Sequence, residues 1–165
     1  MRENRRKKKL IRIRNTRQAF YECIDDLVKH PLVVQMKKYP QHGNTNCYRH
    51  CLHVAYYNYR ICARMGLRAR EAARAGMLHD MFLYDWHTYA RETGSRFHGL
   101  KHPGRVLKVV QGSFSLSELE KDMILKHMWP LTPVPPRYAE SYIICLVDKY
   151  CSTCETIERF WKKSR

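Results

Sequence analysis

Helix signals follow one another along almost the whole chain of 165 residues, and no credible series of strands separates them. Apolar residues recur at helical spacing, while caps and breakers divide the pattern into segments. The sequence therefore predicts an all-α, single-domain bundle of about six or seven helices. The expected helices lie at about 15–29, 31–38, 46–65, 68–78, 102–111, 117–128 and 140–161, and a loop is expected from about 82 to 101. Asn15 or Thr16 is expected to cap the first helix, and Asn44, Thr45 or Asn46 the third, which Gly66 ends. His102-Pro103 and the capping box Ser117-x-x-Glu120 are expected to start the helices that they open.

Composition limits the compartment and the number of cores. With 44% hydrophobic residues, a chain of this length can bury one core. It has no stretch of 18 or more apolar residues, the length typical of a membrane span, and its basic start lacks the apolar run of a secretory signal. Its seven cysteines are odd in number and show no secreted-scaffold spacing. We therefore expect a soluble, cytoplasmic protein.

The net charge of +16 is unusually high and raises the question of an anionic partner. The first 17 residues hold nine Lys or Arg against one Glu, so residues 1–14 are predicted to be a basic tail and residues 15–165 the domain. A basic surface attracts nucleic acid, membranes or small polyanions. The chain shows neither RNA-binding motifs nor alternating aromatic and basic positions. A small phosphorylated substrate, such as a nucleotide, is therefore favoured, and nucleic-acid binding through the tail stays open without being favoured.

The most core-like segment, AARAGMLHDMFLYDWH at residues 72–87, leads directly into ionisable groups. Its small residues favour close helix packing, and the doublet His79-Asp80 follows them. Because buried His and Asp are costly without partners, this doublet needs something to pair with it or bind to it.

Four further residues supply that context, since each lies in an apolar or helix-forming surrounding on a different predicted helix. Imidazole and carboxylate groups projecting inward from neighbouring helices form metal sites in helix bundles. This donor set suits two divalent transition-metal ions of Fe, Mn, Zn or Co, with Asp80 bridging them. The predicted ligands are His50, His79, Asp80, His102, His127 and Asp148.

Cationic side chains close to these ligands in sequence are candidates for binding substrate phosphate. Lys101, Arg105 and Lys149 are predicted to bind the substrate. Besides Asp80, we expect His98 and Lys126 to act in catalysis, His98 as a phosphate contact or an acid.

The order His50, His79-Asp80, His102, His127, Asp148 resembles the HD superfamily of metal-dependent phosphohydrolases, in the version with six ligands and two metals. Short motifs around these residues also resemble those of the superfamily: CLHVA after His50, GMLHD at residues 76–80 and LVDKY at residues 146–150. The resemblance spans about residues 46 to 150, and the chain looks like the short bacterial HD proteins that carry FLYDWH and HMWPLT. It implies an HD-domain-like helical fold.

The residues and the resemblance together predict a phosphohydrolase that cleaves a phosphoester or phosphoanhydride, with a nucleotide as the expected substrate, by attack of a metal-bound hydroxide. Two alternatives stay open. Some relatives with this ligand arrangement are mixed-valent di-iron oxygenases, and a non-catalytic nucleotide-binding or sensor module could keep the same site.

Overall fold

The computed structural model describes residues 2–84 and 98–163, with side chains for residues 15–84 and 100–158. Within these ranges the chain forms helices and connecting turns, with one isolated bridge between Pro40 and Asn46 and no strand. The all-α, single-domain prediction is confirmed. The helices are α1 (Arg2–Val28), α2 (Pro31–Gln35), η1 (Met36–Lys38, a 3-10 turn), α3 (Cys47–Met65), α4 (Ala69–Leu78), α6 (His98–Gln111), α7 (Glu118–Lys126) and α8 (Ala139–Lys163).

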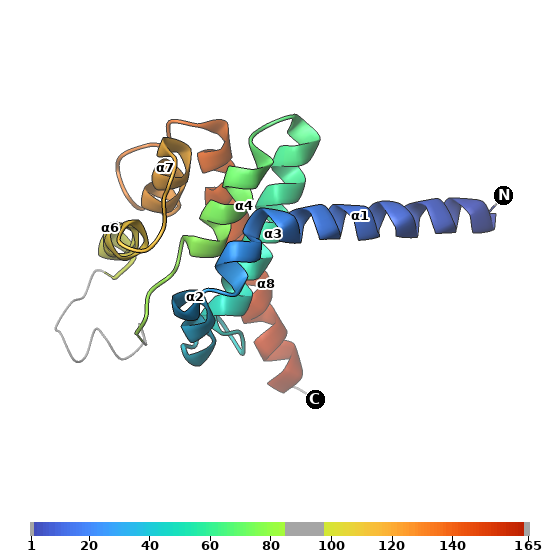
Figure 1. Ribbon diagram of the computed structural model, residues 1–165. Helices are drawn as coiled ribbons and strands as arrows, with labels where there is room; N and C mark the ends of the chain where they lie inside the picture. Colours follow the sequence, from blue (N-terminus) through green and yellow to red (C-terminus); the bar gives the residue numbers. More distant parts are fainter. Residues whose placement is uncertain (1, 85–97, 164–165) are drawn as a thin grey trace.

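Helices α3 and α4 form a tight hairpin at the centre of the molecule (Figure 1). The Asn46 side chain accepts the Arg49 backbone N–H at 2.9 Å and starts α3, and Gly66 ends it with a φ of 69°. A Cβ placed on Gly76 would lie 2.7 Å from the Cα of Ala55. The absence of a side chain at residue 76 therefore allows the two helices to approach each other closely.

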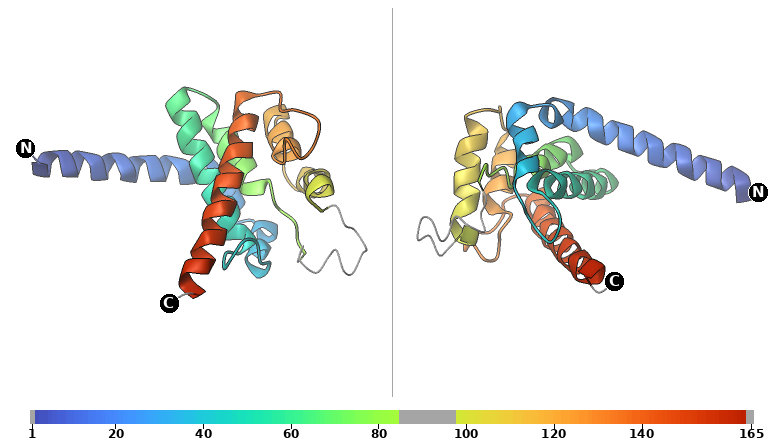
Figure 2. Two further views of the ribbon diagram at one scale, coloured as in Figure 1. Left: turned by 180° about the vertical axis from the view of Figure 1, so that it is seen from behind. Right: turned by 90° about the horizontal axis from the view of Figure 1, so that it is seen from below.

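Helices α1, α7 and α8 pack around this hairpin, as the two views of Figure 2 show, and the core lies between them. Its members include Phe20, Ile24 and Leu27 of α1, Met77 and Leu78 of α4, Met123 of α7 and Ile144 of α8, all at most 1% exposed.

One arginine connects three helices at the edge of this core. Arg74 of α4 contacts Asp26 of α1 at 2.6 Å and Glu120 of α7 at 3.1 Å. Glu120 also completes a capping box with Ser117, which starts α7 as the sequence predicts. The ends of the helices are thus fixed by polar contacts as well as by apolar packing.

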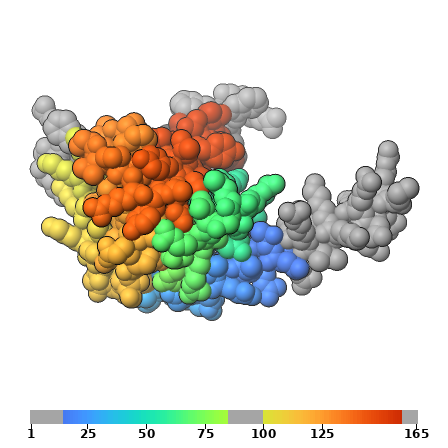
Figure 3. All heavy atoms as spheres, turned by 90° about the horizontal axis from the view of Figure 1, so that it is seen from above, coloured from blue at the N-terminus to red at the C-terminus, as the bar shows by residue number. Residues whose placement is uncertain are grey.

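A second polar contact closes the end of the bundle at the α3–α4 turn. Arg68 donates from Nε to Glu140 of α8 at 3.1 Å, and its guanidinium lies over the Tyr138 ring. Figure 3 shows this face, where the green turn and the orange residues before α8 lie side by side.

Two helix boundaries differ from the sequence predictions. Helix α1 begins at Arg2, so Asn15 and Thr16 lie inside it instead of capping its start. The proposed boundary at residue 14 is crossed by this helix and stays a prediction. Helix α6 begins at His98, four residues before the expected start, and contains Pro103. None of the helices in the described ranges is long and apolar enough to cross a membrane.

Candidate metal centre

The ends of helices converge on one buried cluster of imidazole and carboxylate groups. His79 is the C-cap residue of α4 and Asp80 follows it, while His127 is the C-cap residue of α7. All six predicted ligands are at most 7% exposed. They fall into two sets whose ligand atoms lie within 4.8 Å of one another: a first ligand group of His50, His79, Asp80 and Asp148, and a second ligand group of Asp80, His102 and His127.

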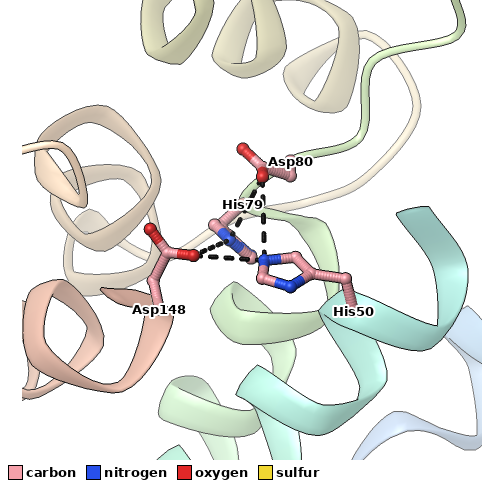
Figure 4. A group of neighbouring side chains, drawn as sticks. All are labelled: His50, His79, Asp80 and Asp148. Atoms are coloured by element: carbon pink, nitrogen blue, oxygen red, sulfur yellow. Dashed lines mark hydrogen bonds and ion pairs between the residues drawn. The ribbon is translucent and has the colours of Figure 1, made fainter. Parts of the chain in front are cut away.

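In the first ligand group, two imidazole nitrogens face two carboxylates (Figure 4). His50 Nε2 lies 3.1 Å from Asp148 Oδ1 and 3.9 Å from Asp80 Oδ2. His79 Nε2 lies 3.6 Å from each of these two oxygens. Four donor atoms from α3, α8 and the end of α4 thus surround one point.

In the second ligand group, the other oxygen of Asp80 is used. Asp80 Oδ1 lies 3.1 Å from His102 Nε2 and 3.4 Å from His127 Nε2, and these two nitrogens are 2.8 Å apart. Asp80 therefore presents one carboxylate oxygen to each group. This is the arrangement expected of a carboxylate that bridges two cations.

The outward nitrogens of three histidines are held, and this fixes which nitrogen faces the cluster. His79 Nδ1 donates to the Gly76 carbonyl at 2.9 Å, and His127 Nδ1 donates to the Ile124 carbonyl at 2.8 Å. His50 Nδ1 donates to Glu155 Oε2 at 2.9 Å. In each neutral ring the Nε2 lone pair then points inward, which is how metal-binding histidines are oriented in proteins.

The imidazole Nε2 atoms and carboxylate oxygens that face the cluster are all hydrogen-bond acceptors when the rings are neutral, so they suit a bound cation better than they suit one another. With His50 Nδ1 donating to Glu155, the lone pair of a neutral His50 Nε2 faces a carboxylate oxygen of Asp148. Among the described residues, His79 Nε2 and Asp80 Oδ1 are buried and make no hydrogen bond. Buried acceptors without a donor are costly, and a positive ion in each group would satisfy them. The residues therefore fit the divalent metals expected from the sequence.

Charge within the cluster keeps the carboxylates ionised. Burial raises the pKa of Asp148, but the adjacent imidazoles of His50 and His79 outweigh burial and hold this pKa well below its usual range. Burial likewise raises the pKa of Asp80, but the charge of His79 and the adjacent imidazoles of His102 and His127 bring it well below its usual range. Ionised carboxylates at these two positions are the form that binds a cation.

The imidazoles of the two groups differ in their tendency to hold a proton. Burial lowers the pKa of His79, but the adjacent Asp80 carboxylate overcomes this, and the pKa stands well above the usual value. Burial also lowers the pKa of His127, and here the contact with Asp80 does not compensate fully, so the pKa stays below the usual value. The second ligand group thus contains an imidazole that stays neutral more readily.

Two polar residues that sequence reasoning missed support the ligands. Gln41 donates from Nε2 to Asp80 Oδ2 at 2.7 Å. Glu155 accepts from His50 and, through its other oxygen, from His53 Nδ1 at 3.0 Å. Burial raises the pKa of Glu155, yet these two hydrogen bonds bring it to about 2. Glu155 lies seven residues after Asp148, and this two-turn spacing could have placed it on the same face of α8.

Two of the predicted substrate-binding and catalytic cations, Lys126 and Lys149, contact groups outside the metal cluster. Lys126 Nζ lies 2.8 Å from the Pro135 carbonyl and 3.2 Å from Asp122, and Lys149 Nζ donates to the Trp129 carbonyl at 2.9 Å. The contacts with Pro135 and Trp129 tie α7 and α8 to the segment between them, and a role for either lysine at the substrate stays a prediction.

The remaining predicted residues lie on α6 or beyond the described ranges. Lys101 is exposed and Arg105 is half-buried, one and three positions from His102. The His98 side chain lies outside the described part of the structure, as do residues 85–87 of the FLYDWH word. The roles of all these residues stay predictions.

The described part of the chain is thus an all-helical domain with a buried His/Asp cluster that can hold metal ions. No protein-family model, no curated protein and no solved structure matches this chain.

Proposed function

We propose that this protein is a metal-dependent phosphohydrolase that acts on a small phosphorylated compound, with a nucleotide as the expected class of substrate. The observation that carries the proposal is the position of Asp80, whose two oxygens face two different sets of ligands. A pair of cations sharing one carboxylate is the arrangement that clamps a phosphoryl group in an in-line displacement.

The sequence resemblance supports the same assignment. The order of the six ligands along the chain is that of two-metal HD phosphohydrolases, and an all-helical bundle is compatible with an HD domain. Membership of that superfamily is part of the proposal, because it rests on the order of the ligands and on the short motifs around them in the sequence.

In this proposal the protein supplies a rigid set of donors. His50 and Asp148 face each other across the first ligand group, and Glu155 fixes the His50 ring from outside. Divalent cations bound there would lower the pKa of water and neutralise charge on a phosphoryl oxygen. Asp80 would be kept in its bridging orientation by the hydrogen bond from Gln41.

Positive charge on the chain would bring the substrate to this cluster. The net charge of +16 favours encounter with a phosphorylated ligand. Lys101 and Arg105 flank His102 on α6, and we assign them to the phosphate oxygens. His98, at the start of the same helix, is assigned to proton transfer to the leaving group.

The test combines metal analysis of the purified protein with a screen of nucleotides and phosphate esters, under air and without oxygen. We expect transition metal in the protein and release of phosphate or a nucleoside monophosphate in both atmospheres. The double variant H79A/D80A should lose metal and turnover together. Asp25→Asn is the matched control, because Asp25 is an exposed carboxylate whose pair with Lys29 is worth little.

Two outcomes would contradict the proposal. Full turnover by the folded H79A/D80A variant would place the chemistry elsewhere in the molecule. Product formation that strictly requires oxygen would assign the cluster to the di-iron oxygenase alternative instead.

A further inference from the structure

The two halves of α1 have opposite surroundings. The second half packs into the core through Phe20, Ile24 and Leu27, which are at most 1% exposed. The first half extends away from the rest of the molecule in every ribbon view (Figures 1 and 2). We call residues 2–17 the basic extension. They hold nine Lys or Arg and one Glu, which is half of the net charge of +16.

The composition of the basic extension opposes the helix that it forms. Like charges stand four residues apart at Arg2 and Arg6, at Arg5 and Lys9, and at Lys8 and Arg12. Such pairs destabilise a helix, and a helix of this length without tertiary packing is marginal in water. An anionic partner that neutralises these charges would remove the repulsion. The helix and its charge therefore point to a polyanion.

We propose that the basic extension is a helical arm that binds the phosphate backbone of duplex DNA without regard to base sequence. An α-helix is about 10–12 Å wide with its side chains, and the major groove of B-form DNA is about 12 Å wide. At 1.5 Å per residue the 16 residues span about 24 Å, over which a duplex carries about 14 phosphate charges. The arm matches a groove of the duplex in width and opposes it in charge.

Other polyanions match the basic extension less well. Helices that lie on membranes need a continuous apolar face. The apolar residues here are Leu10, Ile11 and Ile13, which fall within a single turn, so no apolar face runs along the length of the extension. Duplex RNA has a deep, narrow major groove that does not admit a helix. Duplex DNA is therefore the partner to which we commit.

The test measures binding of the full chain to a fluorescent DNA duplex of about 20 base pairs at about 50 and 200 mM salt. The variant R5Q/R6Q/K8Q/K9Q removes four charges but keeps good helix formers. The matched control K38Q/R64Q/R70Q/K108Q removes four charges from exposed positions on η1, α3, α4 and α6. We expect the first variant to bind at least about 100-fold more weakly, with a salt slope reduced by about four, and the control to stay within about fivefold of wild type.

The assay also separates this proposal from the proposed hydrolase function. The H79A/D80A variant, which lacks two of the six predicted metal ligands, should bind DNA as wild type does, whatever its turnover. Unchanged thermal melting of R5Q/R6Q/K8Q/K9Q would show that the packed half of α1 is intact. Equal losses in the two quadruple variants, tighter binding to a duplex RNA, or tighter binding to phosphatidylserine vesicles would each overturn the assignment to DNA.

Discussion

The two ligand groups share Asp80 but differ in how firmly the protein holds them. The first has four ligands, on α3, α8 and at the end of α4, and its His50 is fixed from outside by Glu155. The second has three, including His102 on α6 and His127 at the end of α7. In the second, two imidazole nitrogens stand 2.8 Å apart. Because affinity rises with the number and the preorganisation of ligands, we expect the first group to bind its cation more tightly.

Removing the shared carboxylate charge should have the largest effect. Asp80→Asn keeps the shape of the side chain but removes the charge that faces both groups. We expect metal content to fall in both groups and any metal-dependent turnover to fall at least about 1,000-fold, as for loss of a central electrostatic group. Metal analysis by mass spectrometry measures the first effect. Retention of two equivalents of metal would show that Asp80 does not bridge.

Removing one ligand from each group should separate their affinities. We expect His127→Ala to leave about one tightly bound ion in the first group, because its four ligands are untouched. His50→Ala should lose the tight ion and keep only weak binding. Calorimetric titration of the metal-free proteins gives both affinities. Equal effects of the two substitutions would remove the distinction between the groups.

The contact behind His50 should have a smaller effect, confined to the first group. Glu155→Gln weakens the hydrogen bond that orients the ring, and losses of this kind cost about 10–100-fold in metal affinity. His53→Ala is the matched control. His53 donates to Glu155 Oε1, so its removal leaves the hydrogen bond between His50 and Glu155 Oε2 in place. We expect less than about threefold from it. If His53→Ala had the larger effect, the orienting role would belong to His53.

Packing beneath the first group gives the smallest effect on the metal. A methyl group on Gly76 would meet the Ala55 backbone at 2.7 Å, so Gly76→Ala must move α4 relative to α3. Overpacking of this kind costs about 1–3 kcal/mol of unfolding free energy. Gly104→Ala on α6 is the matched control, since a Cβ there meets nothing within 4 Å. Thermal melting should show a loss for the first substitution and none for the second.

The sequence predicted the helices where caps and breakers are local. Gly66 and the Ser117–Glu120 box end and begin their helices where expected, and Asn46 is the one of the three candidate caps that starts α3, because each acts through bonds to nearby backbone. The start of α1 was missed because a run of like charges opposes a helix locally. The start of α6 was missed because proline favours the first turn of a helix, which predicts a start at His102-Pro103, whereas Pro103 lies inside α6.

The six residues of the buried cluster could be predicted from sequence, but their supporting contacts could not. Each ligand combines an ionisable side chain with an apolar surrounding, which is visible along the chain. Gln41 lies in a loop without any such pattern, and only the folded chain brings it 2.7 Å from Asp80, 39 residues away. The contact of Lys126 with the Pro135 carbonyl likewise depends on how the α7–α8 connection turns back.

Helices α4 and α7 both end at the cluster, at His79 and His127. The carboxyl end of a helix carries about half a negative charge, because its last carbonyl groups point outward along the axis. Two such ends add to the charge of Asp80 and Asp148 in attracting cations. The same field repels a free phosphate group. The cluster should therefore bind anionic substrates only after its metal ions, and the order of binding follows from the direction in which two helices run.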